Sequence, residues 1–253
     1  GDSETQWSRL AARYLRKEFA LTKEVKRATV HIAGMGLYEL FINGQRIGEQ
    51  VLAPAPTDYR KTILYNTYDV TPQLQKENAI GVILGNGRFY TMRQNYKPYK
   101  IPTFGYPKLR LNLIIEYTDG SRQTIASDIS WKLTTEGPIR SNNEYDGEEY
   151  DARKELGDWN RTGYDDTNWI PAGRVSIPSG TLRAQMMPGM KVTESLKPVS
   201  IRKQGDKHIL DIGQNMAGWL RIRIKGQAGD SIRLRFAERL QADGEIFTKN
   251  LRD

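Results

Sequence analysis

The sequence predicts an all-β protein, in which one β-sandwich is followed by part of a second β-sandwich. Three observations support this fold class. The dominant hydrophobic period is two, turn dipeptides separate the alternating segments, and the clearest helix signal is the short stretch that Thr71 and Pro72 open. A chain of 253 residues is long enough to bury the core of one large β domain or of two smaller ones.

Two hairpins are predicted in the first half of the sequence. Residues 38–47 read YELFINGQRI, and Asn43 with Gly44 supplies the residue types that a type I′ turn requires. Residues 109–117 read LRLNLIIEY and place four leucine or isoleucine side chains and a tyrosine on one face. The turn sequence TDG at 118–120 then leads into a further strand, so this segment is expected to be half-buried in a sheet.

A third hairpin is predicted near the end of the sequence. Apolar residues alternate over 220–224 and 232–236, and a glycine-rich stretch at 226–229 joins the two segments. An isolated hairpin is only marginally stable, so we expect its apolar face to pack on the first domain or on another copy of the chain. Its opposite face is basic, and we interpret it as solvated or as a contact with a neighbouring domain: Arg221, Arg223, Lys225, Arg233 and Arg235.

The domain boundary is predicted where proline and glycine accumulate, between about residues 178 and 198. We therefore expect a first sandwich at 10–182, a linker at 183–198, and the start of a second, incomplete sandwich at 199–253. The last segment is too short to close a sandwich by itself, so the chain is expected to stop inside a second domain.

Composition excludes several functional classes. The chain has no cysteine, which excludes disulfides, thiolate catalysis and zinc–thiolate sites, and its two histidines cannot make a histidine-rich metal site. The net charge is +8, but the basic residues are scattered over polar strand positions, so we expect no nucleic-acid partner. No apolar run of about 18 residues is present, so we expect no membrane partner. The sequence starts at Gly1, and we expect a removed leader and a periplasmic or secreted location.

Several segments, in this order, carry a resemblance to a known family: GLYELFINGQRIG, LAPAPTDYRKTILYNTYDVT, NAIGVILGNGRFY, YDGEEYDAR, YDDTNWIPA and a long final stretch that begins DIGQNMAGWL. Read together, they resemble the N-terminal part of bacterial α-L-rhamnosidases, inverting glycoside hydrolases that remove terminal rhamnose. The resemblance covers the chain from about residue 13 to its end. It implies a galactose-binding-like β-sandwich (a jelly roll), then another β-sandwich that begins at DIGQN, and then an α-helical barrel with the catalytic glutamates.

No counterpart of that barrel or of its catalytic stretch occurs among these 253 residues. The resemblance therefore implies a non-catalytic accessory region of an α-L-rhamnosidase that acts on rhamnose-containing glycans, with a carbohydrate-binding role open and this chain alone inactive. The missing catalytic domain is then a further candidate partner for residues 199–253. The alternative is a purely structural β-sandwich module without a ligand.

The stretch NNEYDGEEYDAR, residues 142–153, gathers five carboxylates in a basic chain. Acid–base catalysis is disfavoured, because an inverting glycosidase needs two carboxylates about 6.5–9.5 Å apart across the sugar, and adjacent Glu148 and Glu149 point in opposite directions in an extended segment. A structural role is favoured, with Asp151 and Arg153 tying the loop down by charge-assisted hydrogen bonds. A cation or sugar site remains the second interpretation.

A second loop, GRFYTMRQNYKPYK at residues 87–100, offers amides, arginines and aromatic rings, which suit sugar hydroxyls and C–H faces. Some relatives carry a calcium-dependent rhamnose-binding module with ligands from loops in about these places, so the resemblance makes calcium a candidate cofactor. Here Gln94 and Asn95 stand without a carboxylate, which departs from that pattern. The predicted carbohydrate-binding residues are Arg88, Tyr90, Gln94, Asn95, Tyr96, Asn142, Asn143 and Glu144.

Overall fold

The computed structural model describes residues 10–90, 104–143 and 147–251, apart from the side chain of Asn143. Internal contacts divide the chain into two compact units, residues 1–191 and 192–253. Strands dominate the described residues, so the prediction of an all-β fold is confirmed. No helix in this part of the chain is long and apolar enough to cross a membrane.

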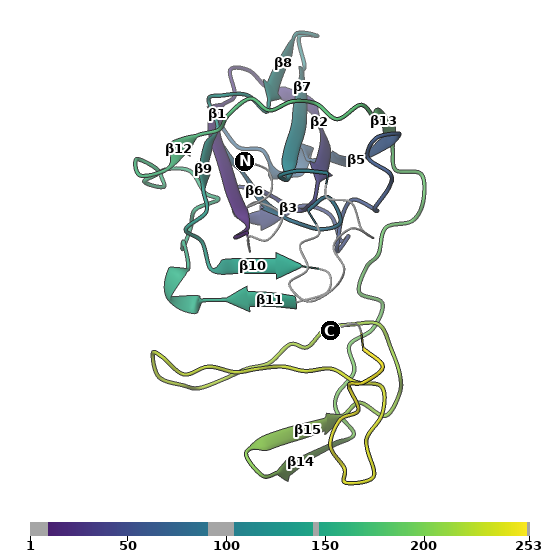
Figure 1. Ribbon diagram of the computed structural model, residues 1–253. Coiled ribbons are helices and arrows are strands. Elements are labelled where there is room, and N and C mark those ends of the chain that lie inside the picture. The colour runs from purple at the N-terminus through teal and green to yellow at the C-terminus, as the bar shows by residue number, and fades with distance from the viewer. Residues whose placement is uncertain (1–9, 91–103, 144–146, 252–253) are drawn as a thin grey trace. The chain divides into compact units, whose positions relative to one another are not determined.

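Two sheets face one another in the first unit (Figure 1). One has the order β12–β9–β1–β6–β3–β4, with the bounds β1 Arg13–Ala20, β3 Leu37–Ile42, β4 Gln45–Arg46, β6 Glu77–Gly85, β9 Lys132–Thr134 and β12 Ile170–Pro171. The other has the order β13–β5–β2–β7–β8, with the bounds β2 Val25–Met35, β5 Thr62–Asp69, β7 Lys108–Tyr117, β8 Arg122–Ala126 and β13 Thr181–Ala184. A separate hairpin pairs β10, Ile139–Asn143, with β11, Gly147–Tyr150.

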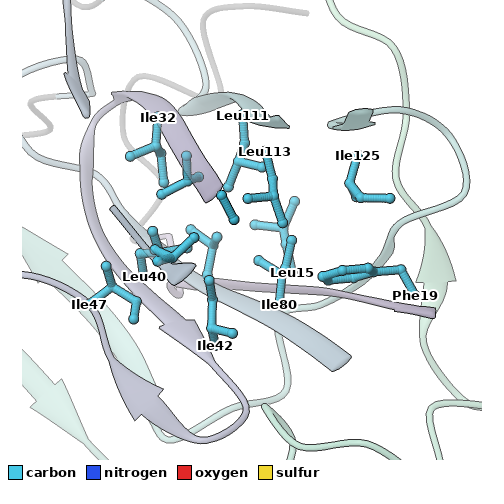
Figure 2. Packing of buried hydrophobic residues seen from close by; sticks show 14 of the residues in the cluster. Leu15, Phe19, Ile32, Leu40, Ile42, Ile47, Ile80, Leu111, Leu113 and Ile125 are labelled. Atoms are coloured by element: carbon cyan, nitrogen blue, oxygen red, sulfur yellow. The ribbon is translucent and has the colours of Figure 1, made fainter. Parts of the chain in front are cut away.

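The inward faces of the two sheets bury the main core (Figure 2). Leu111, Leu113 and Ile115 of β7 are completely buried, as the alternating pattern predicts. They pack with Leu40 of β3 and Ile80 of β6 from the opposite sheet. Burying such a side chain contributes about 1.5–3 kcal/mol, so this layer holds the sandwich together.

The predicted hairpin around Asn43 and Gly44 is confirmed: both residues have positive φ, at 52° and 80°. The Asn43 amide also joins neighbouring segments, because Nδ2 donates to the Gln73 carbonyl and Oδ1 accepts from the Ala79 amide, each at 2.9 Å. The helix predicted nearby is only a three-residue 3₁₀ turn, η1, Thr71–Gln73.

A second, smaller core covers the outer face of the first sheet. Trp159 and Trp169 lie in the segment that follows the 3₁₀ turn η3, Ala152–Lys154, and both are buried against Tyr14 of β1. Gly81 of β6 lies directly beneath them, where an added Cβ would come within 2.8 Å of the Trp159 ring. A larger residue at this position would therefore push the covering segment away from the sheet.

The first unit extends further along the chain than the predicted boundary at residue 182. The strand β13 pairs in parallel with β5, the Val51 amide donates to the Met190 carbonyl, and Gln50 forms a β-bridge with Lys191. Residues 183–191 of the predicted linker thus pair with the sandwich. β13 has only four residues, which is too short a segment for its periodicity to be recognised.

The described part of the second unit contains the hairpin of β14, Ser200–Gln204, and β15, Lys207–Asp211. The prediction of strands at 220–224 and 232–236 is wrong, because these described residues form no strand. Five apolar side chains of these segments are between 42% and 55% exposed, and a two-stranded ribbon without a covered face is marginal. They are Ile222, Ile224, Ile232, Leu234 and Phe236.

Candidate functional site

The candidate site lies at one end of the first sandwich, where Asn86 directly follows β6. The Asn86 amide N–H donates to Asn142 Oδ1 (2.6 Å), and Asn86 Nδ2 donates to the carbonyls of Asn142 (2.9 Å) and Leu10 (3.0 Å). Asn86 Oδ1 accepts from Arg13 of β1 at 2.9 Å. One buried asparagine thereby fixes the ends of β1, β6 and β10 relative to one another.

An aromatic cluster fixes the two chain segments that border this end. The rings of Tyr59 and Phe89 are 5.0 Å apart, edge to face, and Phe104 stacks on Phe89 at 5.8 Å. The Phe104 amide also donates to the Phe89 carbonyl at 2.9 Å. These contacts hold residues 89 and 104 side by side.

A tyrosine pair forms the surface of the site. The rings of Tyr90 and Tyr106 are nearly parallel, with centroids 6.0 Å apart and an interplanar angle of 6°. Tyr90 is buried, whereas Tyr106 is 47% exposed. Burial lowers the pKa of the nearby Arg13, and the adjacent tyrosines act in the opposite direction. The arrangement offers one exposed ring above a buried ring and a partly desolvated guanidinium, and among the described residues it brings no pair of opposed carboxylates together.

The structure places only some of the predicted binding residues. Arg88 is exposed and Tyr90 is buried. The side-chain amide of Asn142 is used within the domain, because Oδ1 accepts from the Asn86 amide and Nδ2 donates to the Leu10 carbonyl at 3.4 Å. Asn143 pairs with Gly147 through its backbone. Four predicted residues, and the side chain of Asn143, lie outside the described residues: Gln94, Asn95, Tyr96 and Glu144.

Sequence analysis missed two members of this site, Tyr106 and Arg13. The first lies in KPYKIPTFGYP, whose prolines indicated only a loop. Arg13 stands at the start of a strand, where an arginine ordinarily faces solvent, and only the packing of the sheets shows that it approaches the tyrosine pair.

The carboxylates of the β10–β11 hairpin fulfil the predicted structural role in part. Asp151 accepts two hydrogen bonds from the Arg153 side chain, at 2.8 and 2.7 Å, and these bonds lower the pKa of Asp151 to about 2. Desolvation and the neighbouring Glu39 carboxylate raise the pKa of Glu148. Glu149 is exposed on the same strand. Of the described carboxylates of this segment, Asp151 therefore supports the loop, whereas Glu148 is repelled by Glu39 of β3.

A calcium ion at this site would need oxygen ligands that are not already engaged. Calcium takes six to eight oxygen ligands, several of them carboxylates or carbonyls. Here both the Oδ1 and the carbonyl oxygen of Asn142 already accept hydrogen bonds from Asn86. Within the described part of the chain, no three acidic or histidine residues are grouped so that they could hold a metal ion. The described residues do not fit calcium, and calcium remains a prediction that concerns the neighbouring residues.

Comparison with known families gives two matches. Residues 23–194 match the family described as the α-L-rhamnosidase N-terminal domain. Residues 201–253 match the concanavalin-like domain of bacterial α-L-rhamnosidases. The two matched regions meet close to the division between the two compact units.

The individual relatives that the chain resembles are also α-L-rhamnosidases. An α-L-rhamnosidase of Formosa agariphila is 41% identical over 94% of this chain, which corresponds to 25% of that protein. The structure of an α-L-rhamnosidase from Dictyoglumus thermophilum is similar with a TM-score of 0.85 and 42% identity, over 93% of this chain and 26% of that one. The structure of a Streptomyces avermitilis α-L-rhamnosidase complexed with L-rhamnose is similar with a TM-score of 0.88 and 37% identity. The similarity covers 95% of this chain and 23% of that one. The chain thus spans about a quarter of the length of the curated relatives it matches.

Proposed function

Because the chain belongs to the family of α-L-rhamnosidase N-terminal domains, we propose that it is an accessory region that binds rhamnose-containing glycans on behalf of an α-L-rhamnosidase. The region itself is non-catalytic in this proposal. The observation that carries the proposal is the exposed ring of Tyr106, supported from below by Tyr90 and placed at the loop end of a β-sandwich. Sugar recognition in such modules uses a ring against the C–H face of the sugar.

Rhamnose suits this surface because it carries a methyl group and several C–H bonds on one side of the ring. The Tyr106 ring covers the apolar side, and the Arg13 guanidinium lies close to the tyrosine pair. The similar Streptomyces avermitilis structure was obtained with L-rhamnose, which makes methyl α-L-rhamnoside a suitable first probe. A single exposed monosaccharide site is weak, since few buried atoms offset the lost freedom, so we expect millimolar affinity, about 4 kcal/mol.

A purely structural module is the second candidate. It is favoured by Asn86 and Asn142, whose amides are engaged in holding the strands together and leave few hydrogen-bonding groups for a ligand. In this alternative the tyrosine pair only closes the end of the sandwich.

An NMR titration of the protein with methyl α-L-rhamnoside separates the two candidates. Binding predicts saturable shifts of the amides of residues 105 and 106, which Tyr106→Ala abolishes while the melting temperature stays within about 2 °C. Tyr150→Ala is the matched control, because Tyr150 is also an exposed tyrosine and lies on β11. Absence of shifts at about 50 mM glycoside, with and without calcium, leaves the structural alternative in place.

The proposal extends to the exposed apolar side chains of residues 222–236. We assign them to a contact with the catalytic domain of such an enzyme or with another copy of the chain. Sedimentation of the chain between low and high concentration distinguishes these, because self-association appears only in the second case. A periplasmic or secreted location completes the proposal, and cell fractionation tests it.

A further inference from the structure

A polar pocket lies on the outer face of the first sheet, and neither tyrosine of the pair lines it. It has a volume of about 470 Å³ and is bordered by β1, β9 and the segment around residue 164. This volume falls within the range of about 300–1,000 Å³ that is usual for small-molecule sites. Four of the side chains that line it have polar groups at their ends: Glu18, Lys132, Tyr164 and Asp166.

A buried arginine fixes the two carboxylates of this pocket. The Arg16 side chain is only 2% exposed, and it donates to the carbonyls of Trp159 and Arg161, both at 2.9 Å. Two further donors form ion pairs with Glu18 and Asp166, whose side chains are 39% and 26% exposed. The guanidinium thus uses four of its five N–H donors inside the protein, and it holds two partly exposed carboxylates in fixed positions.

Several polar atoms at the pocket remain open to a ligand. Arg16 and the Gly163 amide bind Glu18 through Oε1, and Arg16 binds Asp166 through Oδ2. Within the residues that the structure describes, no hydrogen bond reaches Glu18 Oε2 or Asp166 Oδ1.

The donors lie beside these acceptors. Lys132 of β9 stands directly opposite Arg16 in the strand pairing, and its half-buried side chain has no hydrogen-bond or ion-pair partner among the described residues. The hydroxyl of Tyr164 has no hydrogen-bond partner there either, although its ring contacts Arg16 and Trp169. Lys17 and Ser130 also line the pocket and are hydrogen-bonded to one another. Of the groups without such a partner among the described residues, the pocket therefore presents two acceptor oxygens, one ammonium group and one phenol.

We propose that this pocket is a second carbohydrate subsite, which binds a neutral pyranose unit through Glu18, Asp166, Lys132 and Tyr164. Neutral sugar hydroxyls both donate and accept, so they donate to the carboxylates and accept from the ammonium group. An anionic ligand would be repelled by the two carboxylates. A metal ion would be repelled by Arg16 and Lys132, and the pocket offers too few oxygen ligands to hold it. The inference rests on the proposed function only in its choice of a rhamnoside as the probe, since the pocket shares no residue with the tyrosine pair.

The test is a titration of the whole chain followed through the amide resonances of Lys132 and Gly163. Methyl α-L-rhamnoside and methyl β-D-glucoside are the neutral probes, and D-glucuronate and calcium chloride are the charged ones. We expect saturable, millimolar shifts with at least one neutral glycoside, and no saturation with either charged probe. Lys132→Ala and Tyr164→Phe should each weaken binding about threefold to tenfold, since each removes one hydrogen bond to the ligand.

Two controls keep the outcome separate from folding and from the other site. Lys61→Ala removes an exposed lysine elsewhere and should change nothing. Tyr106→Ala should remove the shifts at residues 105 and 106 and leave those at Lys132 and Gly163. The inference is overturned by any of three results: no saturable shift of either amide with any neutral glycoside at about 200 mM, tighter binding of glucuronate or calcium, or unchanged affinity in both pocket variants.

Discussion

Replacing Arg16 by methionine tests the packing of the outer core. The substitution keeps an unbranched side chain but removes hydrogen bonds to two carbonyls and ion pairs to Glu18 and Asp166. Removing one partner of a buried ion pair costs about 3–5 kcal/mol, because the remaining charge is left uncompensated. Both carboxylates are partly exposed and can be hydrated, so we expect a loss near the lower end, about 3 kcal/mol.

For a domain of this size, such a loss corresponds to a fall in melting temperature of about 6–12 °C. Urea unfolding followed by tryptophan fluorescence measures it, since Trp159 and Trp169 pack directly over the affected strand. Neutralising the carboxylates as well, with Glu18→Gln and Asp166→Asn, should recover at least about 1 kcal/mol.

Arg122→Met is the matched control, because Arg122 is exposed and pairs with Glu116 on the surface; it should change stability by less than about 0.5 kcal/mol. A loss below about 1 kcal/mol in Arg16→Met would refute the reasoning, since the guanidinium would then contribute no more than a surface charge.

Three further substitutions probe other contacts. Gly81→Ala places a Cβ within 2.8 Å of the Trp159 ring and should cost about 1–3 kcal/mol in urea unfolding; wild-type stability would show that the covering segment moves freely. Glu148→Gln removes a carboxylate whose pKa is raised by desolvation and by Glu39. A raised carboxyl pKa costs stability only where the group is charged, so the variant should be more stable than the wild type at pH 7 by less than about 1 kcal/mol. This gain should vanish below about pH 4, and a gain that grows as the pH falls would contradict the reasoning. Asn86→Ala should cost about 1–3 kcal/mol and speed amide exchange in β10, and unchanged exchange would argue against its role as a tie.

Local patterns in the sequence predicted the sandwich well where a strand buries only one face. The period-two alternation of residues 109–117 and the Asn43-Gly44 turn both describe what the structure contains. The same rule failed at 220–224 and 232–236, because alternation states which face is apolar and says nothing about whether another surface covers it.

The candidate sites were harder to predict, because they depend on contacts between distant segments. Tyr106 and Tyr90 are separated by a proline-rich stretch, and their stacking has no periodic signature in the sequence. Arg16 stands on a strand as an ordinary polar position, yet it is buried by residues about 145 positions away. Long-range burial of a charged residue follows from the fold, and only its partners make it tolerable.

The central claim is that the chain binds a rhamnoside without cleaving it, and one NMR experiment with an aryl α-L-rhamnoside tests both parts. Saturation of the protein methyl resonances should transfer to the C6 methyl group of the glycoside, and Tyr106→Ala should weaken that transfer. The glycoside signals should keep their full intensity over a day at about 1 mM ligand. Release of free rhamnose by the purified chain, or the absence of any saturation transfer, would contradict the account.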